Sequence, residues 1–348
     1  MTTPSRPMLE AALTAPTGDD VMGEDPTVKE LQDSAAKLFG KEAGLFVPTG
    51  TMANLVSLLA HCRHDRAAEI IIGTMSHLCL WEGGNVANLG GIHTKQIRED
   101  SQSGQFNVQD IRDAYRTDND DHYPKTQVLC IENSQNMLGG IALPPTYVND
   151  TLGPLCSELN IALHVDGARI FNAATHHNVP VKELCRAADS VSVCLSKGLG
   201  APLGSVVVGD AECIRLAKRA RKRCGGGMRQ VGVVAAMGLY ALQHNVKLLP
   251  DDHRRAQRLA ADLSSYGFRV TRNGQVDTNI FYFAIPSNLD MSKEEYQRIL
   301  RDTYGVKITG GYNKGGELFR VVTHLDITDK DIEYAADAMI RAAGVSTK

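Results

Sequence analysis

From about residue 27 to 240, short apolar runs of strand type alternate with longer stretches in which apolar residues recur at helical spacing. This alternation is typical of crossover units, in which helices join parallel strands and cover both faces of the sheet. Several of the runs are continuous in Val, Ile and Leu, which suits strands buried on both faces. The pattern therefore predicts an α/β fold with a mostly parallel sheet. The candidate strands are residues 44–48, 68–73, 126–132, 160–166, 190–197 and 204–209.

The pattern changes beyond about residue 240. A helix, a strand, a second helix, a second strand and a terminal helix follow one another, which indicates a compact α+β unit. These elements are expected at 251–266, 279–285, 292–304, 318–325 and the C-terminus. We therefore predict a large domain over residues 1–240, with a short N-terminal arm, and a smaller domain over residues 241–348.

Charge and hydropathy exclude some classes of partner. A formal net charge of −3 and a pI near 6.4 offer no global electrostatic reason to bind nucleic acid or an anionic membrane. The basic run RLAKRARKR (215–223) lacks interleaved aromatic residues, so we interpret it as a solvated helix face. No apolar run is long enough to span a bilayer, and the N-terminus lacks a signal-peptide pattern. We expect a cytoplasmic protein that acts on a small molecule.

The strongest single segment is NIALHVDGARIFNA, a predicted buried strand that ends in the carboxylate of Asp166. In open α/β sheets, ligands bind beyond the carboxyl ends of the strands, so Asp166 would face a ligand. A second interpretation is equally open at this point, because Asp166 could instead cap the helix that follows.

A second segment, SVSVCLSKGLGAPLGSVVVG, brings Lys197 from the end of a strand into a glycine-rich turn. Its apolar flanks would strip water from the amine, which favours the neutral form that attacks carbonyl groups. The glycines leave room for a bulky aldehyde cofactor to approach the backbone. The plain alternative is a solvated lysine at a strand end.

A third segment, FVPTGTMANLVSLL, reads as a strand, a turn and an amphipathic helix. The backbone N–H groups of Gly50 and Thr51, together with the helix dipole, could hold a phosphate. An ordinary helix cap at Thr49 or Thr51 explains the segment equally well. A phosphate cup, a strand-end acid and a strand-end lysine, in this order, are what a pyridoxal-phosphate site on a parallel sheet requires.

Five segments strongly resemble the low-specificity L-threonine aldolases of fold type I: PTGTMANL, LHVDGARIFNA, CLSKGLG, GGGMRQ and RVVTHLD. They occur in the same order along nearly the whole chain. The resemblance implies pyridoxal 5′-phosphate as cofactor and cleavage of L-threonine or L-allo-threonine into glycine and an aldehyde. It also implies a homodimer or homotetramer with active sites near the subunit interface.

The resemblance also assigns roles to single residues. Lys197 would bind the cofactor aldehyde covalently, and Asp166 would pair with the pyridine nitrogen. His77, in TMSHLCLWEGG, matches a histidine that stacks on the cofactor ring, and it is a candidate base for the substrate hydroxyl. Gly50 and Thr51 would hold the phosphate.

Four basic residues are expected to bind anionic groups. Arg169 and Arg320 match the positions that hold the substrate carboxylate, and Arg169 is expected to contact the cofactor as well. Lys222 and Arg229 flank the glycines at 225–227. They could add positive charge near the cofactor, including from a neighbouring subunit.

Three features depart from the family pattern. Relatives usually begin with an R-S-D-T segment whose hydroxyl helps to bind the substrate carboxylate, whereas this chain starts near Thr2, just after it. Met22 stands where the family's D-D-V-Y-G has a tyrosine, and Gln135 stands where its E-N-T-H has a histidine. Gln135 could hydrogen-bond the substrate hydroxyl but cannot act as a base at neutral pH.

These departures leave other interpretations open. The chain could bind the cofactor yet be weakly active or inactive, or it could be an incomplete gene product of an active enzyme. It could also be a β-eliminating lyase that uses the same cofactor. No metal is expected, because the Cys and His residues show no metal-ligand spacing.

Overall fold

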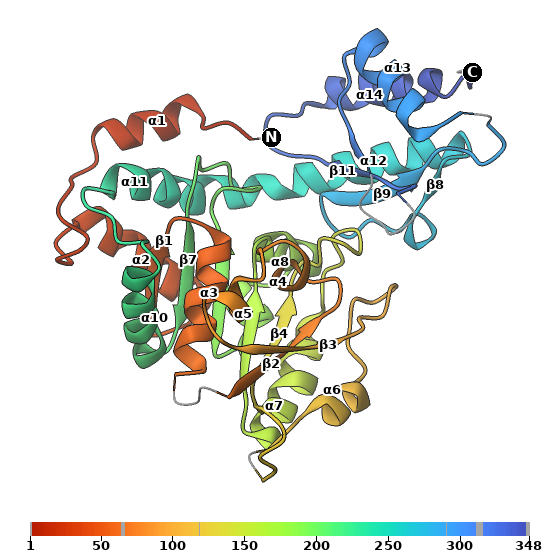
Figure 1. Ribbon diagram of the computed structural model, residues 1–348. Helices are drawn as coiled ribbons and strands as arrows, with labels where there is room; N and C mark the ends of the chain where they lie inside the picture. Colours follow the sequence, from red (N-terminus) through yellow and green to blue (C-terminus); the bar gives the residue numbers. More distant parts are fainter. Residues whose placement is uncertain (1, 64–66, 118, 290, 311–315, 346–348) are drawn as a thin grey trace.

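A seven-stranded sheet forms the centre of the larger part of the molecule (Figure 1). The structure is a computed structural model that describes residues 2–63, 67–117, 119–289, 291–310 and 316–345. Along the sheet the order is β1-β7-β6-β5-β4-β2-β3, and β7 runs antiparallel to both of its neighbours while β6, β5, β4, β2 and β3 pair in parallel. The strands are β1 (Ala43–Val47), β2 (Ala68–Gly73), β3 (His93–Ile97), β4 (Lys125–Glu132), β5 (Ala162–Asp166), β6 (Ser190–Cys194) and β7 (Ser205–Gly209).

The α/β class and the mostly parallel sheet predicted from the sequence are confirmed. Each of the six predicted strands is present; β2, β6 and β7 are buried along their whole length, and the other three are buried over most of it. The edge strand β3 was not predicted, because its sequence HTKQI is largely polar and partly exposed. A short apolar run is a clear signal only for strands covered on both faces.

Helices cover the sheet on both sides (Figure 1). A representative one is α2 (Pro26–Phe39), whose N-cap Asp25 accepts a hydrogen bond from a backbone N–H of the first turn. Gly40 ends this helix with a φ of 63°, which a residue without Cβ adopts at little cost. Leu31 and Phe39 are buried on one face, each worth about 1.5–3 kcal/mol of transfer free energy.

The other helices of this part are mostly short. They are α1 (Arg6–Leu13), α3 (Gly50–His61), α4 (His77–Leu80), α5 (Asn85–Asn88), α6 (Val108–Ala114), η1 (Tyr147–Leu152), α7 (Gly153–Leu159), α8 (Ile170–His177), α9 (Val181–Leu184), α10 (Ala211–Arg223) and α11 (Gly232–Tyr240). In α10, the basic run 215–223 includes the buried Arg221, whose guanidinium pairs with Asp20 at 2.9 Å.

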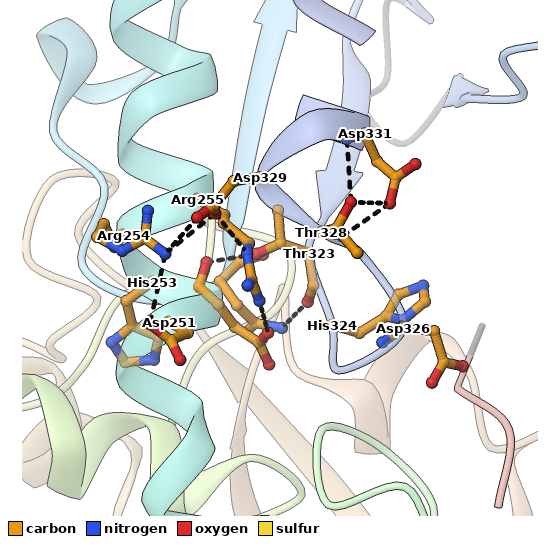
Figure 2. Close-up of polar contacts among 12 residues, drawn as sticks. Asp251, His253, Arg254, Arg255, Thr323, His324, Asp326, Thr328, Asp329 and Asp331 are labelled. Carbon is orange, nitrogen blue, oxygen red and sulfur yellow. Dashed lines mark hydrogen bonds and ion pairs between the residues drawn. The ribbon is translucent and has the colours of Figure 1, made fainter. Parts of the chain in front are cut away.

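A four-stranded antiparallel sheet, in the order β10-β11-β9-β8, forms the C-terminal part together with three helices. Arg254 and Arg255 of its first helix bind Asp329 at the start of its last, and Thr328 and Asp331 cap that last helix (Figure 2). These elements are α12 (Leu249–Ser265), β8 (Arg269–Val270), η4 (Arg272–Gly274), β9 (Ile280–Ala284), α13 (Lys293–Tyr304), β10 (Thr309–Gly310), β11 (Phe319–Val322) and α14 (Asp329–Ala342).

A continuous run of helical residues joins the two parts. It comprises α11, η2 (Ala241–Asn245), η3 (Val246–Leu248) and α12, which follow one another across the top of the large sheet in Figure 1. Leu249 still packs in the core of the large part, whereas Ala256 belongs to the core of the small part. The two cores therefore meet inside this helical run rather than at a loop.

The N-terminal arm also touches both parts. Met8 and Ala12 of α1 are buried in the core of the large part, against α11. Before the helix begins, the backbone N–H of Thr3 donates to Asp326 of the small part at 2.8 Å. Among the residues that the structure describes, no helix is both long and apolar enough to cross a membrane.

Candidate active site

Three chemical groups meet where β4, β5 and β6 end. Glu132 is the last residue of β4 and pairs in register with Asp166, the last residue of β5. Lys197 follows the end of β6 by three residues. Because these strands are parallel neighbours, their carboxyl ends share one edge of the sheet, and the two residues predicted there, Asp166 and Lys197, come together.

A cavity of about 390 Å³ opens at this edge. Lys197, His77 and Arg169 contribute to it from the large part, and Arg320 contributes from β11 of the small part. Its lining is His77, Trp81, Glu132, Asn136, Ala168, Arg169, Lys197 and Arg320. A second cavity of about 600 Å³ shares both arginines and the lysine and extends toward the small part. The site thus lies between the two parts of the chain.

Asp166 is buried below this cavity and accepts two hydrogen bonds. The donors are the side-chain amide of Asn54, at 2.9 Å, and the backbone N–H of Ala168, at 3.1 Å. The helix α8 begins at Ile170 and its N-cap is Arg169, so Asp166 is not its cap. The helix-cap interpretation of Asp166 is therefore wrong, and its carboxylate is oriented as a fixed acceptor.

His77 forms a pair with Glu82, a residue to which the sequence had given no role. Its Nδ1 lies 2.9 Å from Glu82 Oε1, and this hydrogen bond is the largest cause that raises the pKa of His77. Glu82 is buried and can only accept when ionised. Nδ1 therefore carries the proton in the neutral ring, which leaves the lone pair on Nε2 for a substrate.

Glu132 is the second acid that sequence reasoning missed. It accepts the backbone N–H groups of His77 and Asn136, at 2.8 and 2.9 Å. Burial, and after it the charge of Asp166, raise the pKa of Glu132 to about 7. A glutamate that ends a continuous apolar strand was the available signal, as it had been for Asp166.

Arg169 and Arg320 both line the cavity. Nη1 of Arg320 donates to Asn136 Oδ1 at 3.0 Å. Burial, and then the charge of Arg320, lower the pKa of Arg169. Two guanidinium groups in one cavity attract an anion, and a carboxylate fits the paired N–H donors of a guanidinium group.

Thr2 brings a hydroxyl to the same place. It lines the larger cavity with Arg169, Lys197 and Arg320, and its Oγ1 donates to the backbone carbonyl of Lys197 at 3.3 Å. Thr2 therefore places a hydroxyl in the cavity that both arginines line.

The segment predicted to hold a phosphate is the first turn of α3. Thr49 is its N-cap and accepts the N–H of Met52 at 3.1 Å, so the helix-cap interpretation is correct for Thr49. The N–H groups of Gly50 and Thr51 precede the helix's own hydrogen bonds and remain directed outward. A Cβ on Gly50 would come within 2.7 Å of Cys194 Sγ, so a side chain larger than that of glycine does not fit.

The remaining predicted residues lie outside the two cavities. Lys222 and Arg229 are exposed, and Arg229 forms an ion pair with Asp19. Gln135 is buried beside a separate small cavity, where its amide donates to the carbonyl of Met75 at 2.9 Å and accepts the N–H of Leu138 at 2.9 Å.

The site's groups fit pyridoxal 5′-phosphate. Lys197 offers an amine for the aldehyde, and the buried Asp166 offers an acid for the ring nitrogen. One nitrogen of His77 lies within 4.8 Å of an oxygen of Asp166, close enough for both to contact one aromatic ring. The start of α3, with the backbone N–H groups of Gly50 and Thr51, offers donors for a phosphate.

Comparisons with known proteins agree with this geometry. A model of the β-eliminating lyase family matches residues 1–286. The low-specificity L-threonine aldolase of Escherichia coli strain K12 is 42% identical, over 97% of this chain and 95% of that protein. The chain belongs to the low-specificity L-threonine aldolase family. A low-specificity L-threonine aldolase of Arabidopsis thaliana is 39% identical, over 98% of this chain and 94% of the relative.

A solved structure confirms the fold type. The threonine aldolase of Leishmania major superposes with a TM-score of 0.78 at 17% identity, covering 98% of this chain and 97% of that structure. This likeness shows fold type I architecture, as the sequence motifs had implied. As a member of the family, the chain is a pyridoxal-phosphate-dependent lyase.

Proposed function

We propose that this aldolase-family chain cleaves L-threonine and L-allo-threonine into glycine and acetaldehyde. The observation that carries the proposal is the convergence of Lys197, His77, Arg169 and Arg320 on one cavity above the buried Asp166. An amine, a base and a paired carboxylate clamp are the parts that this reaction needs.

The bound cofactor supplies an electron sink for the electron pair released when a bond to Cα breaks. Lys197 would hold its aldehyde carbon, and Gly50 and Thr51 its phosphate. Asp166 would keep the ring nitrogen protonated. This requires a shift of about two pKa units, or roughly 3 kcal/mol, which a buried carboxylate in contact can supply.

Arg169 and Arg320 would bind the substrate carboxylate from opposite sides. A carboxylate bound by two guanidinium groups has little rotational freedom. The two arginines would therefore determine which bond to Cα points away from the ring plane. For threonine this must be the Cα–Cβ bond. Thr2 would add a hydroxyl contact from the larger cavity.

His77 would take the proton of the substrate hydroxyl at Nε2 while Glu82 stabilises the charge that develops on the ring. Loss of that proton lets the Cβ–O bond become a carbonyl as the Cα–Cβ bond breaks. The proton that His77 took would be returned to Cα, so that glycine and acetaldehyde form with no net change in protons. Gln135 would reach the substrate only by leaving its present partners, so Asn136 is the better placed amide.

The test is a product analysis of purified protein with L-threonine and L-allo-threonine, with and without added cofactor. We expect equal amounts of glycine and acetaldehyde, and loss of both in Lys197→Ala. The match to the β-eliminating lyase model favours one competing reaction, β-elimination, which would yield ammonia and 2-oxobutanoate instead. Cofactor binding without turnover of either substrate would indicate the inactive relative.

We further propose a cytoplasmic homodimer or homotetramer in which Lys222 and Arg229 serve the site of a neighbouring subunit, and a domain boundary near residue 240. Two observations support the role of Lys222 and Arg229 between subunits. Both residues are exposed and lie outside this chain's own two cavities, and the loop at 225–227 lies against Met52 of α3. Mixed oligomers of Lys197→Ala and Lys222→Ala chains should regain activity that neither variant has alone. If they do not, the residues do not act between subunits.

A further inference from the structure

Below the cavity, one amide joins the two acids of the site. Asn54, on α3, is 1% exposed. Its Nδ2 donates to Asp166 Oδ2 at 2.9 Å and to Glu82 Oε1 at 2.8 Å. A single side chain thereby contacts both the acid beneath the cofactor ring and the acid partner of His77.

These contacts fix which way the amide points. Ionised carboxylates only accept hydrogen bonds, so both bonds from Asn54 to the acids must use its N–H groups. Its Oδ1 then faces the opposite direction, where Ser192 Oγ lies at 2.7 Å and His164 Nε2 at 3.1 Å. Because Oδ1 can only accept, Nε2 of His164 carries a proton.

The same donor-to-acceptor direction holds for the hydrogen bonds that continue into the sheet. Burial, and then the charge of His61, lower the pKa of His164 to about 3, so its ring is neutral and Nδ1 accepts from Ser190 Oγ at 2.8 Å. The same oxygen lies 2.8 Å from His61 Nε2, which donates to it. Every donor in this series of hydrogen bonds, from His61 through Asn54, is therefore directed toward Asp166.

Hydrogen bonds aligned in one direction polarise one another and stabilise the anion at their end. If the network served only to satisfy buried polar groups, its direction would not matter. Here the series ends on the two carboxylates that the proposed reaction uses. The other buried side chains of α3 are mostly apolar, among them Leu55, Val56 and Leu58. A buried amide at position 54 therefore calls for a specific explanation.

We propose that Asn54, held in place by His164, is a positioning residue that aligns Asp166 with the cofactor ring and Glu82 with His77. The proposal rests on the proposed function, because it takes Asp166 to face the ring nitrogen. Asn54 alone would thus position both the acid that faces the cofactor ring and the acid that pairs with the base His77.

The first test needs no cofactor. In cofactor-free protein labelled with nitrogen-15 histidine, with His164 assigned by its loss in His164→Gln, we expect a neutral ring protonated at Nε2 across the neutral pH range. A ring protonated at Nδ1, or one that titrates near neutral pH, would overturn the proposal, since Asn54 would then be oriented the other way.

The second test compares variants of the holoenzyme. Asn54→Ala should still bind the cofactor at Lys197, but kcat should fall about ten- to a hundredfold while KM, set by the arginines, changes little. The pH midpoint of the cofactor's visible absorption should move by about one unit, the effect of one lost hydrogen bond to a charged group. If Asn54→Ala does not fold, His164→Leu provides the same readouts, and His164→Gln, which keeps a donor, should restore them.

Ser57→Ala is the matched control, because Ser57 is equally buried on α3 but donates to the carbonyl of Ala53. It should change neither kcat nor the absorption midpoint. A purely structural role for Asn54 would lower thermal stability and leave the midpoint unmoved, which would overturn the proposal. Wild-type protein that binds the cofactor but leaves threonine intact would instead contradict the proposed function, and the midpoint comparison would still decide on Asn54.

Discussion

Glu132 and Asp166 end neighbouring parallel strands in register, and only one of them is bound by the amide of Asn54. Asp166 receives that hydrogen bond, whereas burial and the charge of Asp166 raise the pKa of Glu132 to about 7. Glu132 is protonated below about pH 7 and ionised above it.

Replacing Glu132 by Gln should remove one ionisation near pH 7 from the pH dependence of kcat/KM. It should also lower kcat about tenfold, because the amide can accept only one of the two N–H groups that Glu132 binds. The measurement is a pH profile on L-threonine. Glu99→Gln is the control, because Glu99 is a buried acid that shares the small cavity with Glu132 but does not line the cavity of Lys197. An unchanged profile in Glu132→Gln would exclude Glu132 from the catalytic ionisations.

The pairing of His77 with Glu82 predicts a shift in the acid limb of the same profile. A base works in its deprotonated form, so a raised pKa of His77 places the limb above the usual range of histidine. Glu82→Gln removes the largest cause of that rise. The limb should move to lower pH, and kcat should fall about ten- to a hundredfold. A limb that stays in place would show that another group is the base.

Arg320→Lys should weaken substrate binding more than chemistry. The lysine keeps the charge but loses the planar pair of donors, so KM for L-threonine should rise about tenfold or more. The dissociation constant of the product glycine should rise in parallel, since both ligands carry the same carboxylate. A control is Arg341→Lys at an exposed helical ion pair. Equal effects of the two substitutions would argue against a carboxylate clamp.

Asp252, a buried residue of α12, predicts a pH dependence of stability. Its carboxylate is fully buried, its oxygens have no hydrogen-bond partner among the described residues, and the guanidinium of Arg255 is 3.7 Å away. Burial raises the pKa of Asp252 to about 7. The folded state thus holds a proton that the unfolded state releases, so stability falls as pH rises from about 4 to about 7.

Asp252→Asn removes this penalty. Relative to the wild type, the variant should gain about 2 kcal/mol more stability at about pH 8 than at about pH 5. Urea unfolding at the two pH values measures the difference. A gain independent of pH would mean that Asp252 does not titrate in this range.

Metal chelation should leave the activity unchanged. His77, Glu82 and Asp166 have ligand atoms within 4.8 Å of one another, a spacing that could hold a metal ion. However, the N–H groups of Asn54 already point at both carboxylates and occupy the positions that a cation would take. Dialysis against EDTA followed by an assay with fresh cofactor checks this. Activity that returns only with added metal would contradict it.

Much of the fold could be predicted because buried strands are recognisable by their own composition. The six predicted strands of the large sheet and both longer strands of the small one were found this way. The strands that were missed, β3, β8 and β10, are polar or only two residues long. Their pairing depends on partners that are distant in sequence.

The site residues likewise divide into those that a local sequence pattern indicates and those that it does not. Asp166 and Lys197 stand at the ends of apolar strands, which made them candidates, and the order of the three segments together with the family resemblance singled them out. Asn54 and His164 lie within apolar segments, and their role appears only when three elements are packed together. Asn136 lines the cavity, whereas its neighbour Gln135 does not. No local pattern in the sequence indicates which of the two side chains faces the cavity.

The helical run that joins α11 to α12 passes from one core into the other without a loop. Arg169 stands on one side of that passage and Arg320 on the other, so the distance between the two guanidinium groups depends on how straight this helix is. A bend of a few degrees near Pro250 would widen or narrow the clamp. Affinity for amino acids would therefore respond to substitutions near Pro250, a residue that lines neither of the two cavities.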